Sequence, residues 1–136
     1  MARKSAKSEG AAGELAVMAA NLAHERNCTD IVVLDLRKTS PVTDYFVICT
    51  GTSDRQMRAV AEEIAECGAA AGQRVWRTAG LDVGQWLVMD FVDVVVHLFD
   101  ETHRKYYDLQ LIWGDCPKVQ WRSRGRQGQD RHEEEE

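Results

Sequence analysis

Two aspartates and a histidine are the residues whose types and spacing best suit chemistry. Asp90 and Asp93 flank the tip of a predicted hairpin, and His97 follows on its second strand. Carboxylates beside an imidazole can hold a divalent metal ion, and metal-dependent nucleotidyl transfer uses carboxylates on adjacent strands in this way. Because a turn separates the two aspartates, strand periodicity does not fix whether they face each other. A solvated turn aspartate with a hydrogen-bonded histidine is the simpler interpretation.

A second candidate site lies where a predicted strand meets a predicted helix, at Gly51-Thr52-Ser53. Backbone N–H groups at a helix N-terminus can bind phosphate. The segment lacks the glycine count of the common nucleotide-binding loops, and Asp54 puts a negative charge where phosphate would lie. Ser53 with Gln56 three residues later matches a capping box, so a capped helix start is the simpler interpretation.

The four cysteines stand at positions 28, 49, 67 and 116, and no pair has CxxC spacing. We therefore expect no zinc site, disulfide framework or other cofactor. Cys49 falls in an apolar strand and Cys67 on an acidic helix, so neither has the electropositive setting of a reactive thiol. The first residues lack an apolar signal segment and no apolar run is long enough for a membrane, which predicts a cytoplasmic protein.

Hydrophobic periodicity predicts the elements that must position these residues. Helical spacing predicts helices at 11–25, from Ser53 to about Gly72, and at 101–113, while short apolar runs predict strands at 31–36, 45–50, 74–78, 86–90 and 94–99. The strand–helix–strand order from 45 to 78 implies a right-handed crossover between parallel strands. Because only residues 91–93 separate the last two strands, these must form an antiparallel hairpin.

These elements predict an α/β fold with a mixed sheet of about five strands and helices on both faces. The length of 136 residues suits a single domain. We place this domain at 11–117. It lies between a disordered basic tail at 1–10 and a charged flexible tail at 118–136, which ends in four glutamates.

The formal net charge is −5, and the acidity belongs to the region 11–117, because the N-terminal tail is basic and the C-terminal tail is balanced. This distribution disfavours binding to bare nucleic acid or an anionic membrane and suits a basic partner. Several aromatic residues also cluster beside acidic ones, namely Trp86, Phe91, Tyr106, Tyr107 and Trp113. Aromatic anchors with an acidic rim are typical of a protein interface, although Trp86 and Trp113 could equally belong to the core.

Four stretches occur together in one order: DYFVICTGTS at 44–53, WLVMDF at 86–91, DVVVH at 93–97 and a segment from Arg104 to Trp113. Their sequence and spacing resemble the ribosomal silencing factor family, also called the Iojap family. The resemblance covers about residues 11–115.

The resemblance implies a nucleotidyltransferase-like fold without the catalytic carboxylates, and so a protein that is not an enzyme. Members of the family bind a large-subunit ribosomal protein of the uL14 type, at the face that meets the small subunit. They thereby block association of the 30S and 50S subunits and repress translation when nutrients are short, and some organellar relatives act in large-subunit assembly. Members often form homodimers.

Carried over residue by residue, the resemblance implies a partner-binding surface of Trp86, Leu87, Asp90, Phe91, Asp93 and His97. The family often has glycine where this chain has Val92, and valine disfavours a positive φ, which leaves the type of turn open. Contact with RNA would be incidental, through the tail at 118–136. A metal-dependent nucleotidyltransferase and a homodimeric scaffold for another basic partner are the alternatives.

Overall fold

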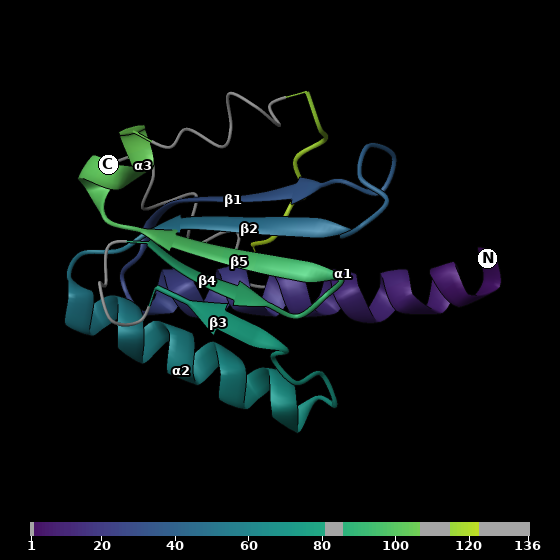
Figure 1. Cartoon of the computed structure of the whole chain (residues 1–136), viewed down its shortest axis with the longest axis horizontal. Coiled ribbons are helices and arrows are strands. Elements are labelled where there is room, and N and C mark those ends of the chain that lie inside the picture. Colours follow the sequence, from purple (N-terminus) through teal and green to yellow (C-terminus); the bar gives the residue numbers. More distant parts are fainter. Residues whose placement is uncertain (1, 81–85, 107–114, 123–136) are drawn as a thin grey trace.

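A five-stranded sheet with two long helices on one face forms the body of the protein (Figure 1). The computed structural model describes residues 2–80, 86–106 and 115–122. Its elements are α1 (Ala2–Glu25), β1 (Thr29–Asp35), β2 (Tyr45–Thr50), α2 (Asp54–Ala70), β3 (Arg77–Ala79), β4 (Trp86–Asp90), β5 (Val94–Phe99) and α3 (Glu101–Tyr106). Within these residues, no helix is long and apolar enough to cross a membrane.

The sheet is mixed and has the strand order β1-β2-β5-β4-β3. The central strands β2 and β5 run parallel, with Tyr45 beside Val94 and Thr50 beside Phe99, whereas every other neighbouring pair is antiparallel. Both central strands are almost wholly buried, which matches their apolar residues on both faces. The predicted α/β fold with a five-stranded mixed sheet is confirmed, as is the β4–β5 hairpin.

The two long helices lie on the same face of the sheet, where they bury the larger core (Figure 1). Helix α2 buries Met57, Val60, Ala61, Ile64 and Gly68, the stripe that its sequence predicts. The opposite face carries a smaller apolar cluster of Leu34, Leu36, Ile48, Phe99 and Cys116. Both long helices therefore pack on one face, and the smaller cluster lies on the other. Of the helix predicted at 101–113, the described part is α3.

Helix α1 begins at Ala2, within the segment 1–10 for which the sequence predicted a disordered tail. Alanine, lysine, arginine and glutamate dominate that segment, and all four are favourable in helices. Gly10 and Ala11 are exposed and Ala12 is buried, and the first turns of α1 extend beyond the sheet (Figure 1). The structure thus lengthens the predicted helix 11–25 in the N-terminal direction.

The C-terminal boundary also differs from the predicted one at 117. Lys118 bridges to Leu34 of β1, the Asp35 N–H donates to the Pro117 carbonyl over 2.8 Å, and the Val119 N–H donates to the Val33 carbonyl over 2.8 Å. The free edge of β1 offers unpaired backbone groups, and the chain uses residues 117–119 to pair with them. The first part of the predicted tail is therefore packed on the domain.

Strand β3 is shorter than the predicted strand at 74–78 and lies at the far edge of the sheet. It pairs antiparallel with β4, with Thr78 opposite Met89. Strand β3 therefore runs in the same direction as β2, as the predicted crossover requires. The two strands are not neighbours, however, because β5 and β4 lie between β2 and β3. The more apolar β5 occupies the central position because it can be buried on both faces.

The β4–β5 hairpin turns at Val92, which has φ of 79°. The Asp93 N–H donates to the Phe91 carbonyl over 3.0 Å, which makes Val92 the central residue of a three-residue γ-turn with positive φ. Such a turn is strained for a β-branched residue. Val92 thus adopts a positive φ, a conformation that glycine would adopt without strain.

Candidate functional site

Three of the predicted site residues, Trp86, Asp90 and His97, lie on the face of the sheet opposite α1 and α2, which we call the distal face. Residues alternate between the two faces of a strand. In β4, Leu87 and Met89 belong to the helix-covered core, so Trp86, Val88 and Asp90 point to the distal face. On β5 the same alternation places His97 there.

Trp86 is held on the distal face by two neighbours on strand β5. Its ring stacks on Phe99, with ring centres 4.8 Å apart and planes at 26°. Its indole Nε1–H donates a hydrogen bond of 3.2 Å to Nδ1 of His97. The register explains both contacts, because Trp86 is directly opposite Phe99 and His97 is the diagonal neighbour on the same face.

His97 is buried to 7% exposure, and the ring of Phe46 packs edge-on against it at 4.7 Å. Because an indole N–H can only donate, Nδ1 must be the acceptor and the imidazole proton resides on Nε2. That buried Nε2 has no hydrogen-bond partner among the described residues. Burial lowers the pKa of His97 from 6.5 to about 4, which favours the neutral ring.

The two aspartates shape the hairpin tip. Asp90 Oδ1 accepts the Val92 N–H over 2.8 Å, which secures the strained turn. The Asp93 carbonyl accepts the N–H groups of Asp44 and Tyr45 and joins the tip to the start of β2. Both aspartates remain partly exposed. Both carboxylates are therefore accessible to a partner, and one oxygen of the Asp90 carboxylate also holds the turn.

Leu87 and Phe91 lie on the other side of the sheet. Leu87 is 1% exposed and Phe91 is 7% exposed, and both belong to the core beneath the helices. The structure thus separates the predicted surface into accessible residues, namely Trp86, Asp90 and Asp93, and buried ones, namely Leu87, Phe91 and His97.

Two of the atoms that could bind a metal at Asp90, Asp93 and His97 already accept hydrogen bonds. His97 Nδ1 accepts the indole hydrogen bond, and Asp90 Oδ1 accepts the turn N–H. Across the part of the chain that the structure describes, no three His, Cys, Asp or Glu side chains are grouped to hold a metal ion. The arrangement suits the hydrogen-bonded histidine and turn aspartate that the sequence offered as the simpler interpretation.

The candidate phosphate loop is a helix cap. Ser53 is the N-cap of α2, and its Oγ accepts the Gln56 N–H over 3.0 Å. The Gln56 side chain in turn accepts the N–H of Thr52, one residue before the N-cap, over 2.9 Å, so the arrangement is a variant of the capping box. A side chain at Gly51 would collide with Met57, so this glycine allows the first turn of α2 to pack on the sheet. The predicted capped start is confirmed.

The cysteines lie mostly in the interior of the protein. Cys28, Cys49 and Cys116 are buried, and all four cysteines are free. Burial raises the pKa of the Cys28 thiol to about 11 and raises that of Cys49 as well. Both thiols are therefore held in the protonated form, which is a poor nucleophile.

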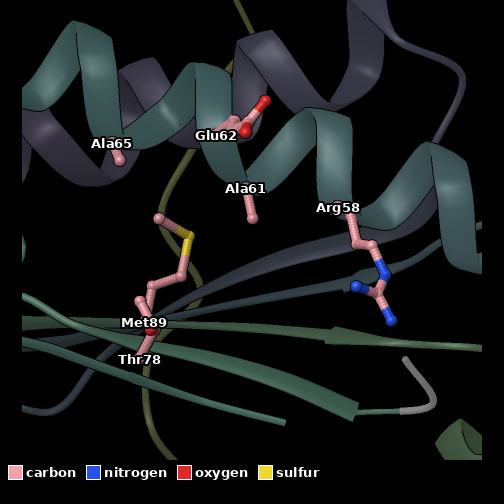
Figure 2. A pocket seen from close by; sticks show the side chains of 6 residues that line it. All are labelled: Arg58, Ala61, Glu62, Ala65, Thr78 and Met89. Carbon is pink, nitrogen blue, oxygen red and sulfur yellow. The ribbon is translucent and has the colours of Figure 1, made fainter. Parts of the chain in front are cut away.

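A cavity of about 270 Å³ lies between α2 and the strands β3 and β4, on the helix-covered side of the sheet. Figure 2 shows Met89 pointing from the sheet toward Ala61 and Ala65 of α2, with Arg58 at one side. The walls of the cavity are mainly apolar, and Thr78 and Glu62 also line it. None of the predicted site residues lines it, so the cavity and the distal face are separate features.

Sequence reasoning missed Phe46 and Val88, which share the distal face with Trp86 and are partly buried. Period-two alternation along β4 could have found Val88. Phe46 could not be placed, because its position depends on the pairing of β2 with β5. The predicted aromatic residues Tyr107 and Trp113 lie outside the described residues, and so does the side chain of Tyr106.

Comparisons with known proteins agree with the motif resemblance. The family described as "Ribosomal silencing factor during starvation" matches residues 9–136, and so extends beyond the 11–115 that the motifs covered. The ribosomal silencing factor RsfS of Bacillus subtilis is 41% identical over 100 residues, which are 74% of this chain and 85% of that protein. The protein of the same name from Halalkalibacterium halodurans is 35% identical over 107 residues, 79% of this chain and 92% of that one. A solved structure of a Chromobacterium violaceum protein matches with a TM-score of 0.72 at 29% identity, over 82% of this chain and 92% of that chain.

Proposed function

The chain belongs to the ribosomal silencing factor family, and from this membership we propose that it docks on the large ribosomal subunit and excludes the small one. Its partner there is a basic ribosomal protein of the uL14 type. Occupying that protein blocks association of the 30S and 50S subunits and so represses translation. The family match over residues 9–136 is the observation that carries this proposal.

The docking surface in this proposal is the accessible part of the predicted set, Trp86 with Asp90 and Asp93. A partly exposed tryptophan beside carboxylates suits a basic partner, since aromatic residues anchor interfaces and opposite charges steer association. Leu87, Phe91 and His97 contribute from beneath, by holding the hairpin in shape. The formal net charge of −5 agrees with a basic partner.

Steric exclusion requires no catalytic turnover, so in this proposal the protein is not an enzyme and needs no cofactor. It acts in the cytoplasm and forms a homodimer. Contact with RNA is incidental and confined to residues near the C-terminus. A nucleotidyltransferase would instead gain thermal stability from Mg²⁺ and nucleotide by mass action.

Sedimentation with separated ribosomal subunits tests the function. We expect the purified protein to migrate with 50S subunits and not with 30S subunits, and to lower the yield of 70S particles when it is added before mixing. Absence from the 50S fraction at both low and physiological salt would contradict the proposal. A thermal shift with millimolar nucleotide and Mg²⁺ would favour the enzymatic alternative.

Two variants test the docking surface, and Trp76→Ala is the matched control for the first. Trp86→Ala should weaken 50S binding by about 30-fold or more, whereas Trp76→Ala should not, because Trp76 is 64% exposed before β3 and outside the proposed surface. Asp90→Asn removes a charge but keeps the oxygen that accepts the Val92 N–H, so it isolates electrostatics from turn geometry. If the Trp86 and Trp76 variants bound 50S subunits equally well, Trp86 would not be part of the docking surface.

A further inference from the structure

We propose that His97 is the positioning residue of the docking surface: its Nδ1 holds the indole of Trp86 in the orientation that the ribosomal partner meets. This inference rests on the proposed function and adds a role for a residue that cannot itself reach a partner, because His97 is buried.

The geometry that carries the inference is a set of contacts between side chains of the neighbouring strands β4, β5 and β2. The Trp86 Nε1–H donates to His97 Nδ1 over 3.2 Å, and the Trp86 ring stacks on Phe99 at 4.8 Å. His97 itself is braced by Phe46 at 4.7 Å from the neighbouring strand β2. The stacking sets the plane of the indole, and the hydrogen bond sets its rotation within that plane.

The hydrogen bond also decides what the indole offers to a partner. Tryptophan has one polar hydrogen, and His97 satisfies it inside the protein. The part of Trp86 that remains accessible is therefore apolar, and a partner can cover it without leaving a buried donor unpaired. An indole turned the other way would present its N–H to the interface and would need an acceptor there.

The unpartnered Nε2 argues that the imidazole is present for its acceptor. A buried polar group without a hydrogen bond costs stability, and a leucine would fill the same core position without that cost. Only the bond from Nδ1 to Trp86 uses the polarity of His97 within the described residues. The unpaired Nε2 of His97 thus lowers the stability of the fold, while Nδ1 of the same residue orients Trp86 in the docking surface.

A matched pair of substitutions separates the acceptor from the shape. Asparagine and leucine branch alike at Cγ, and asparagine places Oδ1 near the position of Nδ1. His97→Asn therefore keeps an acceptor that His97→Leu lacks. We expect the leucine variant to unfold at a denaturant concentration no lower than the asparagine variant does. We nevertheless expect it to bind 50S subunits about fivefold more weakly, which corresponds to the typical contribution of one hydrogen bond.

The indole N–H signals in a ¹H–¹⁵N spectrum report the orientation without any partner. Trp86→Phe identifies the Trp86 signal by its loss. We expect this signal to shift and to exchange faster with solvent in His97→Leu, and to stay close to its original position in His97→Asn. If His97 had only a structural role, the Trp86 indole signal would change to the same extent in both variants.

Three results would overturn the inference. The first is equal 50S affinity of the leucine and asparagine variants when the wild type binds. The second is an unchanged Trp86 indole signal in His97→Leu, which decides the matter even if the wild type fails to bind and the proposed function falls. The third is a remaining difference between the two variants in the Trp86→Phe background, where no indole N–H is left to donate.

Discussion

The ring of Phe91 lies against Gly68 so closely that a Cβ atom on residue 68 would stand 3.0 Å from Phe91 Cε2. The same Cβ would stand 2.7 Å from the carbonyl oxygen of Gln73. The missing side chain thus lets the end of the β4–β5 hairpin sit on the last turns of α2. The tip that presents Asp90 and Asp93 is therefore fixed from the opposite side of the sheet.

Gly68→Ala should destabilise the protein by about 1–3 kcal/mol, because the collision with backbone outweighs the helix propensity of alanine. Gly10→Ala in α1 is the matched control, since nothing lies within 4 Å of the position that its methyl group would take. The control should gain up to about 1 kcal/mol. Urea unfolding of both variants measures the difference, and a stabilised Gly68 variant would contradict this packing.

Val92→Gly should stabilise the protein by about 0.5–2 kcal/mol, because glycine adopts the φ of 79° without strain. The control is Val42→Gly at a position that is 77% exposed and is not among the described residues with positive φ. There, glycine only adds entropy to the unfolded chain, so stability should fall slightly. Thermal unfolding compares the two, and losses of equal size would show that the turn carries no strain.

The buried neutral His97 should make stability depend on pH between 6.5 and about 4. In that window the unfolded chain binds a proton that the folded protein does not, so stability falls as the pH falls, by at most about 1.4 kcal/mol per unit. Above pH 6.5 this contribution is flat. Denaturant unfolding at several pH values should show a shallower acid slope for His97→Leu than for the wild type, and parallel curves would refute the depressed pKa.

A chain ending at Cys116 should be at least about 2 kcal/mol less stable than one ending at Arg122. The longer chain keeps the two backbone bonds of Pro117 and Val119 to β1 and the 2.7 Å bond from Asn21 Nδ2 to the Trp121 carbonyl. It also keeps Val119 and Trp121 packed against the core. Equal unfolding midpoints would restore the domain boundary at 117.

The sequence predicted the fold well wherever the pattern was local. The strands 45–50, 86–90 and 94–99 and the buried stripe of α2 lie where periodicity placed them. Three features needed long-range information: the pairing of β2 with β5, the return of 117–119 to β1, and the placement of both long helices on one face. Each feature depends on which surface a distant part of the chain leaves uncovered. A short stretch of sequence carries no information about such distant segments.

The candidate site was predicted as a set of residues and not as an arrangement. Trp86, Asp90 and His97 do share one face, as alternation along two paired strands allows. The bond between Trp86 and His97 depends on the register of the hairpin, which the three-residue tip fixes only once its turn is known. The inward direction of Leu87 follows from α1 and α2 covering one face, which the sequence alone did not settle.

The pairing of residues 117–119 with β1 has a consequence for the order in which the protein is made. All five strands precede this segment in the chain, so during synthesis the sheet can assemble while the edge of β1 is still bare. A bare edge is a template for strands of other molecules. The newly made chain is thus exposed to association until residues 117–119 emerge, and these residues then cover the β1 edge of the folded protein.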